Sequence, residues 1–175
     1  LLLPAPAGAN DSEMATLRKN LGSLFSKFGL KDIGLNVGRS LINPATGQLA
    51  GEGTEGLYIN DLRTIYLAVD RIDRDGSKTP AQRLAALAEI MTHEVIHALR
   101  SLDLFTDTEW RTLENAVTRT KKPGMQVTYL TLATRQYPGN PSKVPGEEKD
   151  PKKWTPESPI VQVEEAIADF FRDFA

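Results

Sequence analysis

The stretch MTHEVIHALR, residues 91–100, contains the only two histidines of the chain, His93 and His97, with Glu94 between them. In an α-helix, residues four apart lie about 40° apart around the axis and about 6 Å apart along it. Both imidazoles can therefore reach one ion, as two zinc ligands from a single helix must. Glu94 falls beside the open coordination position, where a carboxylate can act as general base on bound water. The stretch predicts a metal-bearing helix; the alternative is a structural pair of core histidines.

The residues before the motif predict that this helix is long, over about 80–101. Thr79 is a suitable N-cap, Pro80 fits the first turn, and Gln82 can complete a capping box with Thr79. Apolar residues then recur every three or four positions, which predicts a stripe facing the core: Leu84, Leu87, Ala88, Met91, Val95 and Leu99.

The rest of the chain predicts an α+β fold in which a small twisted mixed sheet packs against the metal-bearing helix and further helices. Alternating and β-branched residues predict strands at 33–37, 57–60 and 64–69, the last two as a hairpin. Apolar periodicity and capping residues predict helices at 11–29, after Thr106 and from Ser158 onwards, with a short element near 127–134. We expect residues 1–10 to be a linker or a processed N-terminal segment and residues 11–175 to be one domain.

Composition excludes several classes of protein. The chain has 175 residues, 40% of them hydrophobic and 25% charged, which is typical of a globular domain. It has no cysteine, so disulfide scaffolds, cysteine-rich zinc modules and thiol nucleophiles are excluded. A formal net charge of −2 is not the footprint of a nucleic-acid-binding protein, and no apolar run approaches the length of a membrane helix. We therefore expect neither nucleic acid nor a membrane as partner.

Two histidines leave a catalytic zinc site incomplete, because such sites usually have three protein ligands and keep the fourth position for water. No other histidine and no cysteine is present, so the third ligand must be a carboxylate. The best candidates lie in EEAIADFF, residues 164–171: Glu164, Glu165 and Asp169. Glu165 and Asp169 share one face of the expected helix, and their apolar neighbours would bury it, so these carboxylates need partners.

HEVIH followed some 70 residues later by EAIAD resembles the gluzincin branch of the zincin metallopeptidases, the thermolysin-like arrangement of HExxH and ExxxD. The resemblance implies a zincin-like fold and a zinc metalloendopeptidase with Zn²⁺ as cofactor. His93, His97 and Glu165 would then be the zinc ligands and Glu94 the catalytic base, with Glu164 as the alternative third ligand. Asp169 would accept a hydrogen bond from the far ring nitrogen of a ligand histidine, His93 first, which fixes the tautomer.

A narrower resemblance covers roughly residues 57–175 and is strong at 93–114 and 160–171: the chain is similar there to zincin-like peptidase domains embedded in large polyvalent proteins of phages and mobile elements. It implies that the domain is part of a larger polypeptide, found in the phage virion or the host cytoplasm, with a peptide or protein substrate. An extended peptide would pair with an exposed strand edge, at 57–60 or 64–69. The alternative is a non-catalytic, metal-stabilised structural or partner-binding domain of a phage particle or effector, with a closed four-ligand site as its signature.

The chain differs from thermolysin in having no third histidine to stabilise the oxyanion. Another donor must assist zinc in binding the developing negative charge if a peptide bond is hydrolysed. The candidates are two tyrosines and two arginines: Tyr129, Tyr137, Arg100 and Arg135.

Overall fold

The computed structural model describes residues 11–41, 54–74, 76–139 and 157–174, so the segment 1–10, expected to be a linker, lies outside the described residues. The α+β class is confirmed. The chain divides into two compact units: the sheet unit, which ends at Leu102, and the helical unit, Asp103–Phe174. That residues 11–175 form a single domain stays a prediction.

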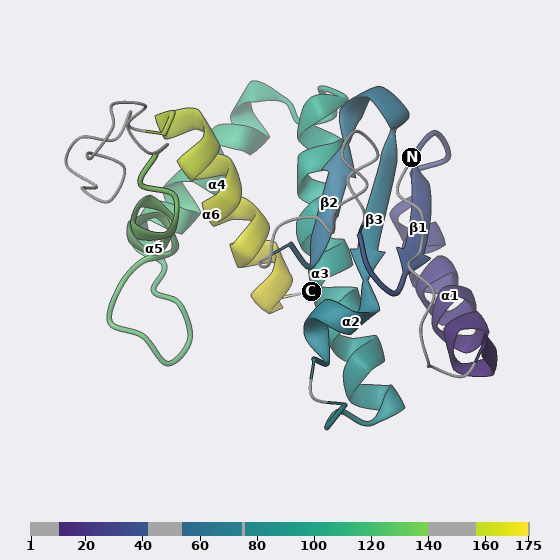
Figure 1. Cartoon of the computed structure of the whole chain (residues 1–175). Helices are drawn as coiled ribbons and strands as arrows, with labels where there is room; N and C mark the ends of the chain where they lie inside the picture. The colour runs from purple at the N-terminus through teal and green to yellow at the C-terminus, as the bar shows by residue number, and fades with distance from the viewer. Residues whose placement is uncertain (1–10, 42–53, 75, 140–156, 175) are drawn as a thin grey trace, which may run out of the picture. The chain divides into compact units, whose positions relative to one another are not determined.

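In its described residues, the sheet unit contains three strands and three α-helices; Figure 1 shows their arrangement. In chain order its elements are α1 (Asp11–Phe25), the 3₁₀ turn η1 (Ser26–Phe28), β1 (Gly34–Gly38), β2 (Gly56–Ile59), the 3₁₀ turn η2 (Asn60–Leu62), β3 (Thr64–Ala68), α2 (Val69–Ile72) and α3 (Pro80–Ser101). The elements expected at 11–29, 33–37, 57–60, 64–69 and 80–101 are therefore confirmed.

The sheet is mixed, with strand order β1-β3-β2. β2 and β3 run antiparallel, as the predicted hairpin requires, whereas β1 and β3 run parallel. β3 is buried on both faces because its side chains alternate: Ile65 and Leu67 join a core built with α1, β1 and α3, whereas Tyr66 and Ala68 join a second cluster with Leu41. Peptide pairing along residues 64–69 is excluded, since β3 already has a neighbour on each side.

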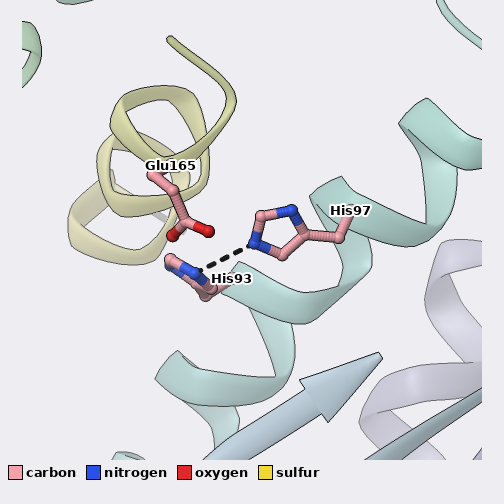
Figure 2. Close-up of side chains that lie close together, drawn as sticks. All are labelled: His93, His97 and Glu165. Atoms are coloured by element: carbon pink, nitrogen blue, oxygen red, sulfur yellow. Dashed lines mark hydrogen bonds between the residues drawn. The ribbon is translucent and has the colours of Figure 1, made fainter. Parts of the chain in front are cut away.

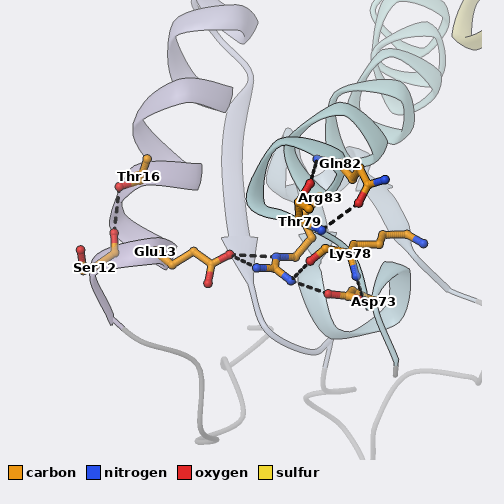
Figure 3. Close-up of polar contacts among 8 residues, drawn as sticks. All are labelled: Ser12, Glu13, Thr16, Asp73, Lys78, Thr79, Gln82 and Arg83. Carbon is orange, nitrogen blue, oxygen red and sulfur yellow. Dashed lines mark hydrogen bonds and ion pairs between the residues drawn. The ribbon is translucent and has the colours of Figure 1, made fainter. Parts of the chain in front are cut away.

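The start of α3 is held by hydrogen bonds that the sequence predicts and by ion pairs that it does not. Thr79 and Gln82 form the expected reciprocal capping box. Arg83 then pairs with Glu13 of α1 and with Asp73 in the turn before α3, and it donates to the Lys78 carbonyl across 2.6 Å (Figure 3). The Asp73 side chain is only 4% exposed. A buried carboxylate of this kind needs such a partner, so Arg83 joins three segments of the sheet unit.

The helical unit consists of α4 (Asp107–Arg119), α5 (Tyr129–Gln136) and α6 (Pro159–Phe174), which pack on one another. Thr106 and Glu109 form the second expected capping box, at the start of α4. Tyr129 lies at the centre: its side chain is 1% exposed, and its ring lies 5.4 Å from that of Phe170. None of the helices in the described parts of the chain is long and apolar enough to cross a membrane.

Candidate metal site

His93 and His97 lie one turn apart on α3, and their Nε2 atoms are 3.2 Å apart (Figure 2). The two rings are inclined by 64° with centroids 5.0 Å apart, so they converge edge to face. Two nitrogens that each lie about 2.0–2.1 Å from a tetrahedral zinc ion are separated by about 3.3 Å. The spacing of the pair fits two ligands of one zinc ion.

Glu94, between the two histidines, points towards the sheet. Its side chain is buried, and its Oε2 accepts a hydrogen bond of 2.8 Å from the main-chain N–H of Tyr58 in β2. An N–H donor to one oxygen restricts the orientation of a carboxylate, as the positioning of a general base requires. The environment of Glu94 therefore fits the role of a base.

The carboxylates expected to supply the third ligand lie on α6, in the helical unit. Glu164 and Glu165 are half-buried, whereas Asp169 is 8% exposed and pairs with Arg172 across 3.0 Å. Figure 2 draws Glu165 with the two histidines, and each of these three side chains offers a ligand atom of a type that zinc accepts. The contact expected between Asp169 and His93 stays a prediction.

The structure separates the four candidate oxyanion donors. Tyr129 is committed to the core of the helical unit, where its hydroxyl donates to Asp173 across 2.7 Å. Tyr137, at the end of α5, donates instead to the Glu165 carboxylate. Burial raises the pKa of the Tyr137 hydroxyl, and the negative charge of Glu165 raises it further, so Tyr137 keeps its proton at neutral pH. Arg135 is exposed and Arg100 half-buried.

Two features of the site were missed in the sequence. The first is the donor to Glu94, which sequence patterns cannot reveal because every residue except proline has a main-chain N–H. The second is the pairing of Tyr137 with Glu165; both residues were named as candidates, but nothing in their spacing connects them. Gln162 strengthens this pairing by donating to the Tyr137 carbonyl across 2.9 Å, which fixes the end of α5 to α6.

No protein-family model, curated protein or solved structure matches this chain.

Proposed function

We propose that this protein is a zinc-dependent peptidase whose metal ligands are His93, His97 and Glu165. The observation that carries the proposal is the convergence of the two histidine Nε2 atoms at 3.2 Å, because two zinc ligands are separated by about that distance. Two structural core histidines could lie at the same distance by sharing a hydrogen bond. That alternative does not explain why the residue between them, Glu94, is a buried carboxylate.

Glu165 is the preferred third ligand for reasons found within the helical unit. The Tyr137 hydroxyl donates to its carboxylate, which restricts its orientation as the outer partner of a ligand does. The resemblance also favours Glu165 over the alternative, Glu164, because the motif EAIAD begins at Glu165.

Each residue of the site has a chemical role in this proposal. Bound zinc would polarise the substrate carbonyl and lower the pKa of a water molecule towards 7. Glu94 would take a proton from the attacking water and return it to the leaving amine. Tyr137 donates its single hydroxyl hydrogen to Glu165, so in this proposal it orients the third ligand and is not the donor to the developing oxyanion.

Metal content tests the proposal most directly. We expect the purified chain to bind about one zinc ion, measured by plasma mass spectrometry, and to lose it in His97→Ala and in Glu165→Ala. Glu89→Ala is the matched control, because Glu89 is an exposed carboxylate on the same helix as the histidines. Failure of the native chain to take up zinc near neutral pH would overturn the proposal.

Hydrolysis of a peptide library by the zinc-loaded chain then separates the two functional classes. Cleavage that depends on Glu94 supports the peptidase. Zinc binding without cleavage would favour the metal-stabilised structural or partner-binding domain. We also propose that the substrate is a peptide or protein and that the domain belongs to a larger polypeptide, as the resemblance to phage polyvalent proteins implies.

A further inference from the structure

The edge strand β2 contacts the HEVIH motif through its backbone. Among the described residues β2 pairs with β3 alone, and its Tyr58 N–H donates to Glu94 Oε2 across 2.8 Å. A hydrogen bond to an ionised carboxylate is about twice as strong as one between neutral groups. A main-chain N–H of the sheet therefore binds Glu94, the residue expected to act as the base.

Gly56, two residues before Tyr58, is the residue that lets β2 approach α3 so closely. A Cβ atom at this position would lie 2.4 Å from Ile90 Cγ2 and 3.1 Å from both Cγ and Oε1 of Glu94. The φ angle of Gly56 is not positive, so the backbone conformation would accept any L-residue. Glycine is required here because of the space that Glu94 and Ile90 occupy.

The Tyr58 side chain fixes the same strand to the end of α3. Its hydroxyl forms a hydrogen bond of 3.0 Å with Ser101 Oγ, which also lies 3.0 Å from the Ala98 carbonyl oxygen. Tyr58 is therefore bound to α3 at two points, by its N–H at Glu94 and by its hydroxyl at Ser101, seven residues further along the helix. Two attachments define the position of the strand on the helix better than one.

We propose that β2 is the positioning element for Glu94: the Tyr58 N–H holds the carboxylate in one orientation, and Gly56 makes the space for it. A glutamate side chain has three rotatable torsions, so a fixed donor pre-organises the base before substrate arrives. The inference rests on the proposed peptidase function for its catalytic consequence, but the contact can be tested without activity. It also limits substrate pairing, because an extended peptide cannot use the Tyr58 N–H while Glu94 holds it.

Amide hydrogen exchange of the full chain without added zinc tests the contact. An edge-strand N–H open to water exchanges quickly, so protection of the Tyr58 amide would report its bond to Glu94. We expect Glu94→Ala to accelerate exchange at Tyr58 at least tenfold, and Glu94→Gln, which keeps a carbonyl acceptor, to accelerate it less. The Ile65 and Leu67 amides of the central strand β3 are internal references and should not change. A Tyr58 amide that is unprotected in the native chain, or unaffected in Glu94→Ala, would overturn the proposal.

Gly56→Ala tests the catalytic consequence, with Gly22→Ala as the matched control. A Cβ at Gly22, on α1, meets nothing within 4 Å. A displacement of about 1 Å at a reacting group can lower the rate about 10²-fold. We expect Gly56→Ala to lower kcat by about that factor, with KM and zinc affinity within about threefold of native. Unchanged kcat in a folded Gly56→Ala would overturn the positioning role. A native chain that binds zinc and cleaves nothing would instead overturn the peptidase, while the exchange data would still decide whether the contact exists.

Discussion

The two regions that supply the candidate ligands differ in how their geometry arises. On α3, His93 and His97 are separated by one helical turn, so the helix repeat places both imidazoles on one face, where their Nε2 atoms lie 3.2 Å apart. On α6, Glu165 is oriented by Tyr137, the residue that follows α5 and lies 28 positions earlier in the chain. The comparison shows that the histidine pair is a local property of the sequence, whereas the orientation of the candidate third ligand depends on tertiary structure.

The largest expected effect concerns the HEVIH motif on α3. Glu94→Gln should keep zinc and the fold but lower the rate of peptide hydrolysis by about 10²–10⁴-fold, because an amide cannot accept the proton from water. Steady-state kinetics on a peptide found by the library search measures the loss. Glu89→Gln, on the same helix but exposed, should retain native activity. Full activity in Glu94→Gln would show that HEVIH does not carry the chemistry.

The choice of the carboxylate ligand on α6 is tested by comparing two neighbouring glutamates. We expect Glu165→Gln to weaken zinc binding by on the order of 10²-fold, since loss of even an outer partner of a ligand costs about 10–100-fold in affinity. Glu164→Gln should stay within about threefold of native. Titration against a competing chelator gives both dissociation constants. The reverse result would assign the third ligand to Glu164 and leave Glu165 as a partner of Tyr137 alone.

The same distinction between local and tertiary features explains which elements were predictable. The capping boxes at Thr79 and Thr106 were predicted from four-residue patterns, because each pairs a residue with one three positions later. The strand order β1-β3-β2 was not predicted, because the parallel pairing of β1 with β3 joins strands on either side of a long connection. Arg83 likewise binds Glu13, 70 residues away, without any sequence signal.

Helix α6 shows the limit of periodicity. The apolar pattern predicts that residues 160–174 bury Ile160, Val163, Ile167, Phe170, Phe171 and Phe174. Ile167 is fully buried, but Ile160 is 66% exposed and Phe174 is 59% exposed. Both lie at the ends of the helix, where there are fewer neighbours, whereas the small residues Ala166 and Ala168 are buried near its middle. Periodicity therefore indicates the buried face of a helix, but it does not indicate how far along the helix burial extends.

A smaller effect is expected from the ion pairs at the start of α3. Arg83→Met should lower the free energy of unfolding of the sheet unit by about 2 kcal/mol, because it removes the charged partner of the buried Asp73. Zinc affinity should not change, since the spacing of His93 and His97 depends on the helix repeat ten residues further on. Denaturant unfolding followed by circular dichroism, with a zinc titration on the same sample, checks both. A large loss of zinc affinity would show that the histidine pair depends on more than its own helix.

The smallest effect concerns the ion pair that joins the loop before α5 to α6. Lys122 Nζ lies 2.9 Å from Asp173 Oδ2, which also accepts the Tyr129 hydroxyl. Burial raises the pKa of Asp173, but the hydrogen bonds from Lys122 and Tyr129 outweigh it and hold this pKa below the ordinary value of 3.8. A carboxyl whose pKa is lower in the folded state adds stability above its unfolded pKa, and this stability is lost as the pH falls through its folded pKa.

We therefore expect Lys122→Met to destabilise the helical unit by about 1 kcal/mol at pH 7, since both partners are partly exposed and solvent screens the pair. Methionine keeps the aliphatic stem beside the Tyr129 ring, so packing is largely preserved. The difference from native should shrink as the pH falls below about 4, because Asp173 then becomes neutral in both proteins. Tryptophan fluorescence follows this unit selectively, since both tryptophans of the chain, Trp110 and Trp154, come after residue 102. A pH-independent difference would mean that Lys122 acts through packing alone and that its ion pair with Asp173, unlike the ion pair of Arg83 with the buried Asp73, adds no stability.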